Sequence, residues 1–89
     1  MFDTSDMVDR VPMREMARQV PSKVYAGARI TRPATPVSVR AWLVDGHGRD
    51  VLVDGEAVAW TARTVHVHYF DQHGREGFVW VWASAVTRR

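Results

Sequence analysis

The chain has 89 residues, of which 46% are hydrophobic and 25% are charged, and its formal net charge at neutral pH is +2, too small to indicate a partner. The length predicts one small domain, and the absence of cysteine excludes disulfides, thiolate nucleophiles and cysteine-ligated metal centres. No apolar run approaches the ~20 residues of a membrane-spanning helix. The first twenty residues carry four acids and lack the apolar core of a signal peptide, so we expect a cytoplasmic protein with no membrane association.

Residues 1–36 are expected to form an arm that precedes the main domain. Residues 1–9 are polar and acidic, which is typical of a frayed terminus. In residues 11–20 apolar side chains recur at spacings of three and four, which predicts a short helix that ends at Pro21. Residues 24–30 are a candidate first strand. Residues 31–36 contain two prolines and predict an extended linker.

The arm is also the basic part of the chain. Between residues 10 and 40 there are seven basic residues and one acid, Glu15, whereas residues 41–87 hold six acids and three arginines. Such an arm could neutralise the phosphates of a nucleic acid. Alternatively, it is solvated or packs on the acidic half of its own chain. The basic residues concerned are Arg10, Arg14, Arg18, Lys23, Arg29, Arg32 and Arg40.

From residue 37 onward the sequence predicts short β-strands. Apolar and polar residues alternate over 37–44, which is the pattern of a half-buried strand. Turn residues follow at 45–48 and 71–76, and Asp54-Gly55 is typical of a two-residue hairpin turn. The expected elements are strands at 37–44, 51–53, 57–61, 63–70 and 77–83, a helical turn at 84–86 and a final edge segment from Thr87.

Five or six short strands with turns every 8–12 residues or so indicate an all-β fold, either a small antiparallel barrel or a sandwich. The hairpin VHVHYFDQHGREGFVWV, followed directly by WASAVTRR, gives residues 37–89 a resemblance to the Src-homology-3-like small β-barrels of the Tudor or KOW kind. This resemblance implies a five- to six-stranded barrel. Because such barrels bind proline-rich peptides, modified side chains or nucleic acid, it implies a binding module without fixing the ligand.

The two strands of that hairpin have two apolar sides. Valines occupy one side and are natural core residues, but the other side carries rings where a solvent-facing row would normally be polar. The rings could be buried under residues 11–30, form a self-association or partner-protein surface, or stack on nucleic-acid bases beside the basic arm. A reversed arrangement, with the rings inside and the valines outside, also fits. The residues on this side are His66, His68, Phe70, Phe78, Trp80 and Trp82.

Little in the sequence indicates catalysis or a cofactor. His66 and His68 are spaced to share a metal ion, with His73 or Asp71 as a third ligand, but two surface histidines beside aromatic or acidic neighbours are the simpler interpretation. The chain has no thiol, no nucleophile elbow around Ser84 and no convincing pair of carboxylates. We therefore expect no enzymatic activity, no metal and no cofactor.

The resulting hypothesis is a non-enzymatic binding module. Our first interpretation is a nucleic-acid-associated accessory or regulatory protein, in which the arm contacts phosphates and the rings form a platform for bases. The alternative is a protein–protein adaptor or inhibitor that uses the Phe78, Trp80 and Trp82 side, and this alternative includes a homodimer. The residues predicted to bind the partner are Arg14, Arg18, Lys23, Arg29, Arg32, Arg40, His66, His68, Phe78, Trp80 and Trp82.

Overall fold

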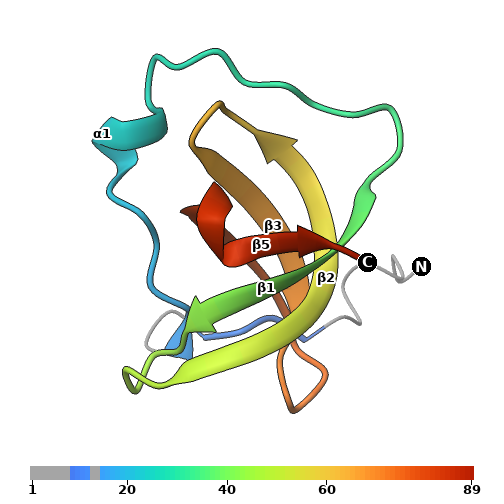
Figure 1. Ribbon diagram of the computed structural model, residues 1–89. Helices are drawn as coiled ribbons and strands as arrows, with labels where there is room; N and C mark the ends of the chain where they lie inside the picture. Colours follow the sequence, from blue (N-terminus) through green and yellow to red (C-terminus); the bar gives the residue numbers. More distant parts are fainter. Residues whose placement is uncertain (1–8, 13–14) are drawn as a thin grey trace, which may run out of the picture.

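The computed structural model describes residues 9–12 and 15–89, and it confirms the all-β class (Figure 1). Five strands form one antiparallel sheet in the order β4-β3-β2-β1-β5. In the part of the chain that is described, no helix has the length and apolar character needed to cross a bilayer. The elements are α1 (Ser22–Tyr25), β1 (Val37–Val44), β2 (Asp50–Trp60), β3 (Thr64–Phe70), β4 (Glu76–Trp82), the 3₁₀ turn η3 (Ala83–Ala85) and β5 (Val86–Arg88).

The predicted hairpin in the second half of the chain is confirmed as β3 and β4. Its register pairs Val67 with Val79 and Val65 with Val81. Val67 and Val79 are fully buried, so the valine side faces the core and the reversed arrangement is wrong. The predicted helical turn and final edge segment are η3 and β5, and β5 pairs with β1. The core cluster consists of Ala17, Val39, Ala41, Leu43, Ala57, Val67, Tyr69, Val79 and Val81.

The predicted turn at Asp54-Gly55 is wrong, because both residues lie inside one long strand, β2. The first half of β2 pairs with β1 and its second half pairs with β3, and Gly55 has a partner on each side. A Cβ atom at Gly55 would lie 2.5 Å from the carbonyl oxygen of His68. The glycine therefore allows the backbone of β3 to approach β2, and it does not serve a turn.

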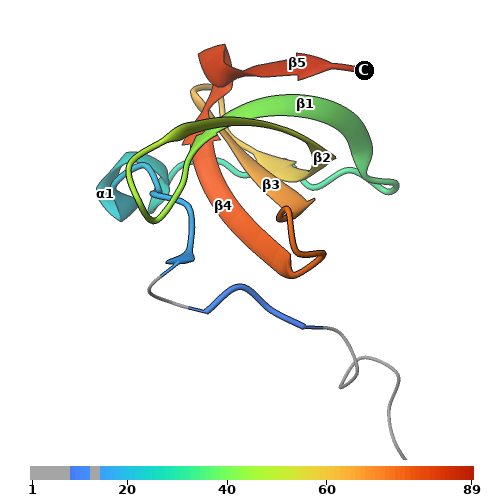
Figure 2. The same cartoon turned by 90° about the horizontal axis from the view of Figure 1, so that it is seen from below.

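The predicted helix over 11–20 is not formed in residues 11–12 and 15–20, and its residues 13 and 14 lie outside the described part of the chain. Instead, the start of the arm adds to the outer edge of β4: the backbone N–H of Val11 donates to the carbonyl of Glu76 at 2.9 Å, and the N–H of Glu76 donates to the carbonyl of Asp9 at 2.7 Å. Further on, the N–H of Val20 donates to the carbonyl of Trp80 at 3.0 Å. A two-turn helix is unstable in water by itself, whereas the edge of β4 offers these backbone groups partners. Figure 2 shows the arm, in blue, passing the end of β4 on its way to α1.

The predicted strand over 24–30 is not formed either. Its first residues belong to α1, and Gly27 follows with a φ of +76°, which breaks an extended run. One isolated bridge remains, in which Thr31 exchanges two backbone hydrogen bonds of 2.8 and 2.9 Å with Trp60. Beyond that bridge the described residues 32–36 have neither helix nor strand, as expected of the proline-containing linker.

We expect Gly55→Ala to lower the free energy of unfolding by about 2–3 kcal/mol, because the added methyl group meets backbone that cannot easily move. Gly74→Ala is the matched control: its methyl group has no atom within 4 Å, so the cost is about 1 kcal/mol for the positive φ alone. Urea unfolding followed by tryptophan fluorescence measures both. If Gly55→Ala lowers the free energy of unfolding by no more than Gly74→Ala does, the close approach of β3 is not the reason for a glycine at position 55.

Candidate nucleic-acid interface

The aromatic row, defined as His66, His68, Phe70, Phe78, Trp80 and Trp82, is assembled by the register of β3 and β4. His66 lies opposite Trp80, and His68 lies opposite Phe78. The rings of His66 and Trp80 are 4.6 Å apart between centroids and nearly parallel, at 4°. The rings of His68 and Phe78 are 4.7 Å apart and tilted by 32°. The contacts continue from His66 to Phe78 and from His68 to Phe70, so five of the six rings touch one another in a chain. Trp82 follows Trp80 on the same side of β4, opposite the core.

The arm covers the Trp80 ring, which lies between Phe78 and Trp82 along β4, and it leaves the rings on either side open. Tyr25 of α1 stacks on Trp80 with a centroid distance of 4.5 Å and an angle of 13°, and Trp80 is 8% exposed. Phe78, Trp82 and Phe70 are 38%, 41% and 52% exposed. Burial under residues 11–30, the first of the three interpretations of the row, thus holds for Trp80 and fails for these three rings.

Arginines lie beside the open rings. The guanidinium carbon of Arg63 lies 5.4 Å from the centre of the Trp82 ring, which is a cation–π contact. The charge of Arg32 reaches His66, where it adds to the effect of burial in lowering the pKa of that imidazole. Arg63 was not among the residues predicted to bind a partner, because it lies in the acidic half of the chain and meets Trp82 only through the β3–β4 pairing.

A groove joins the row to the arm and to β1. Its volume is about 350 Å³, and residues 18–21 of the arm form one wall. Trp42 of β1 lines the groove and is 54% exposed, and Trp82 and Arg18 also line it. The alternation in 37–44 already placed Trp42 on the outward side of its strand, but nothing local indicated that it would share a groove with Trp82.

The basic residues predicted to bind a partner divide into two groups. Arg40 is held by Asp54 at 2.9 Å and Arg10 lies 3.9 Å from Glu76, whereas Arg14 lies outside the described residues. The exposed cations that make no ion pair with another described residue are Arg18, Lys23, Arg29, Arg32, Arg63 and Arg88.

In contrast to these unpaired cations, most of the acidic side chains that the structure describes form ion pairs within the protein. Five carboxylates are engaged in ion pairs within the protein, and in the described part of the chain Asp9, Asp50 and Glu56 make none. The surface is thus more cationic in its unpaired groups than the net charge of +2 suggests. The engaged carboxylates are those of Glu15, Asp45, Asp54, Asp71 and Glu76.

The two hairpin loops, which join β1 to β2 and β3 to β4, repeat one motif, Asp-x-His-Gly-Arg, at 45–49 and 71–75. In each loop one carboxylate oxygen accepts the backbone N–H of the histidine and of the arginine, at 2.8 and 2.9 Å from Asp45 and at 2.9 Å in both cases from Asp71. The glycines have φ of +81° and +74°. Both turns were predicted, but their repetition was missed, although it can be read directly from the sequence.

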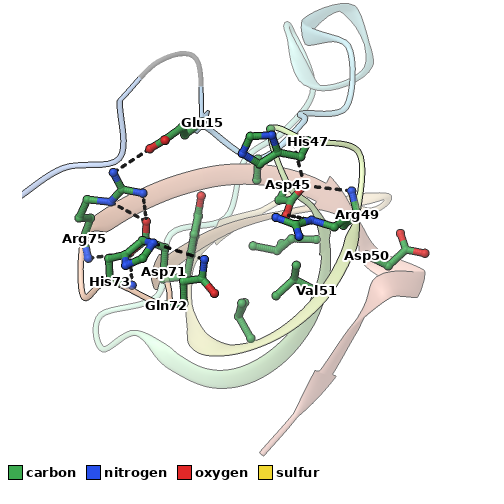
Figure 3. A pocket seen from close by; sticks show the side chains of 15 residues that line it. Glu15, Asp45, His47, Arg49, Asp50, Val51, Asp71, Gln72, His73 and Arg75 are labelled. Atoms are coloured by element: carbon green, nitrogen blue, oxygen red, sulfur yellow. Dashed lines mark hydrogen bonds and ion pairs between the residues drawn. The ribbon is translucent and has the colours of Figure 1, made fainter.

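A cleft of about 340 Å³ lies between these loops and is drawn in Figure 3. Arg75 bridges its rim, with one guanidinium nitrogen 2.7 Å from Asp71 and another 2.7 Å from Glu15 of the arm. Burial alone would raise the pKa of Asp71, but hydrogen bonds from Arg75 and His73 lower it below its ordinary value. These carboxylates stabilise the loops and the docked arm through their ion pairs with Arg75.

The suggested histidine metal site is not assembled. His66 stacks on Trp80, and Nε2 of His68 lies 2.8 Å from a carboxylate oxygen of Glu76. Asp71, offered as a third ligand, is bound by Arg75. Over residues 9–12 and 15–89, no group of three or more histidine, cysteine, aspartate or glutamate side chains is arranged to hold a metal ion.

No protein-family model, curated protein sequence or solved structure matches the chain. The resemblance to Src-homology-3-like barrels therefore stays a prediction, and the functional conclusions depend on the contacts described above.

His66 should make stability depend on pH. Burial and then Arg32 lower its pKa below 6.5, so the unfolded chain takes up a proton that the folded protein resists. The free energy of unfolding should therefore fall as the pH drops through about 6.5 and level off below the folded-state pKa. His66→Phe keeps a ring beside Trp80 and removes the proton, so its profile should be flatter. Urea unfolding of both proteins from about pH 8 to about pH 5 tests this expectation. If the free energies of unfolding of the original protein and of His66→Phe change with pH in parallel, the expectation is wrong.

Proposed function

We propose that the protein is a non-enzymatic module that binds nucleic acid through the aromatic row and the arginines beside it. The observation that carries this proposal is the contact of Arg63 with the exposed ring of Trp82, next to a groove lined by Arg18 and Trp42. Rings of this kind stack on bases at about 1–3 kcal/mol per base, and guanidinium groups bind phosphates in a bidentate manner. A surface on which rings and guanidinium groups lie side by side can therefore bind both the bases and the phosphates of a nucleic acid.

The fold supports a module of the Src-homology-3-like barrel kind. The curved sheet, the hairpin of β3 and β4, the one-turn link η3 and the return of β5 to β1 follow the order expected of such a barrel. We propose that the sheet acts as this barrel and that the protein serves in the cytoplasm as an accessory or regulatory factor. Within it, Arg18, Arg32 and Arg63 would contact phosphates, while Trp82 and Phe78 would stack on bases.

Binding should be measured by fluorescence anisotropy with single-stranded and duplex oligonucleotides of about 15 nucleotides at low and high salt. Trp82→Ala should weaken binding by about 5- to 100-fold, because a stacking ring is lost. Arg63→Ala should reduce the slope of log affinity against log salt by about 0.7–0.9.

Arg49→Ala is the matched control for this measurement. It also removes one exposed arginine, but Arg49 lines the cleft between the two hairpin loops, does not line the groove, and pairs with Asp45. The affinity of Arg49→Ala for the oligonucleotides should stay within about twofold of that of the original protein. The absence of binding at low salt, or an affinity that ignores salt, would refute the proposed function.

A second candidate function is association with a protein partner, including another copy of the chain. It is favoured by Trp42 and Leu52, which pair across β1 and β2 and are 54% and 45% exposed. An exposed apolar pair of this size is typical of interfaces. Light scattering over a range of concentrations should then show a dimer that Trp42→Ala dissociates, whereas a monomer at every concentration would remove the self-association form of this alternative.

A further inference from the structure

The segment 21–30, here called the strap, is fastened to the sheet at both ends. On one side the N–H of Val20 donates to the carbonyl of Trp80 at 3.0 Å. On the other side Thr31 and Trp60 exchange hydrogen bonds of 2.8 and 2.9 Å. In Figure 1 the chain forms α1 and then arches away from the sheet before it enters β1. The strap therefore has two fixed ends, each on the backbone of a tryptophan.

Between those ends the strap is loosely held. Its helix α1 has four residues, no side-chain hydrogen bond at its N-cap and no buried residue. A Cβ atom at Gly27 would have no neighbour within 4 Å, so the chain there is surrounded by open space. The aromatic contact between strap and sheet is the stack of Tyr25 on Trp80. Moving Tyr25 away would break few other interactions.

The Tyr25 ring lies where a planar ligand would lie on this surface. Its centroid distance of 4.5 Å and angle of 13° to Trp80 are those of offset stacking. Trp80 also stacks on His66, so it is the central ring of a group of three. It is the most buried ring of the row because the strap covers it. The stacking position on Trp80 is therefore occupied by the protein's own side chain.

We propose that Tyr25 occupies a base-binding position on Trp80 and that the ligand is a single-stranded nucleic acid, one base of which displaces Tyr25. This inference rests on the proposed function. A base within a duplex has neighbours on both faces, whereas an unpaired base can be splayed out and stacked on a protein ring. Lys23 and Arg29 lie on the strap on either side of Tyr25, are exposed and make no ion pair with another described residue, so they are placed to meet the phosphates next to that base.

Displacement has a measurable consequence. In the free protein, Tyr25 must leave Trp80 before a base can stack there. The apparent affinity is therefore reduced in proportion to the fraction of molecules in which Tyr25 has left Trp80. Tyr25→Ala removes this competition, so it should bind an oligothymidylate of about 15 nucleotides about 3- to 10-fold more tightly. Tyr25→Phe keeps the stacked ring and should bind like the original protein. A duplex of the same length should bind all three proteins alike.

Fluorine NMR of the full chain labelled with 5-fluorotryptophan gives a second readout, with the Trp80 resonance assigned through Trp80→Phe. In Tyr25→Ala without ligand, this resonance should move toward the position of an exposed tryptophan. In the unmutated protein, adding the oligothymidylate should shift the Trp80 resonance together with that of Trp82. The second experiment needs no Tyr25 variant, so it decides the matter even if Tyr25→Ala fails to fold.

The outcomes separate this inference from the proposed function. If neither the original protein nor Tyr25→Ala binds the oligothymidylate, the proposed function fails and the inference fails with it. If the original protein binds but Tyr25→Ala binds no more tightly than Tyr25→Phe, the displacement of Tyr25 is wrong and the proposed function stands. A shift at Trp82 with none at Trp80 would lead to the same conclusion.

Discussion

The register of β3 on β4 is the constraint on which the rest of the structure depends. It places Val67 opposite Val79 on the inner side and His66 opposite Trp80 on the outer side. Side chains alternate strictly along a strand, so a slip of one residue would turn the rings inward and the valines outward. The fully buried valines oppose such a slip. The same hydrophobic packing that stabilises the core thus also presents a row of rings to the outside.

The outer edge of β4 explains why the arm takes the conformation it does. A strand at the end of a sheet exposes unpaired N–H and C=O groups, which other chains can join. Here Asp9, Val11 and Val20 use some of those groups, and Ala17 enters the core. The ion pairs of Glu15 and Arg10 add to this attachment. The arm protects an edge, contributes to packing and carries Tyr25 to the aromatic row.

The features that sequence reasoning found are those encoded by neighbouring residues. The alternation around Val67 and Val79 and the turn residues at 45–48 and 71–76 specify hairpins locally, and the structure has them. The arm was misread because its apolar spacing fits a helix, while its hydrogen-bond partners are supplied by β4, more than fifty residues away. Gly55 was misread as a turn for a related reason: the need for a glycine comes from the backbone of β3.

The candidate interface was predicted only in part, again because some of its contacts join residues that are far apart in the sequence. Two of its parts, the outward rings and Arg18 and Arg32, were selected from the sequence. Trp42 and Arg63 were not, because each becomes part of the surface through a contact that the sheet creates. Their individual sequence neighbourhoods carry no sign of it. A strand pattern shows which way a side chain points but not which distant side chain it will meet.

The repeated loops bear on how the molecule folds. Each Asp-x-His-Gly-Arg loop is closed by contacts among residues no more than four apart, so both hairpins can form early and independently. Asp71 orients Arg75 within its own loop, whereas the ion pair with Glu15 joins residues far apart in the chain, so we expect the arm to attach late. Stopped-flow kinetics should accordingly show that Asp71→Ala slows folding, whereas Glu15→Gln mainly accelerates unfolding.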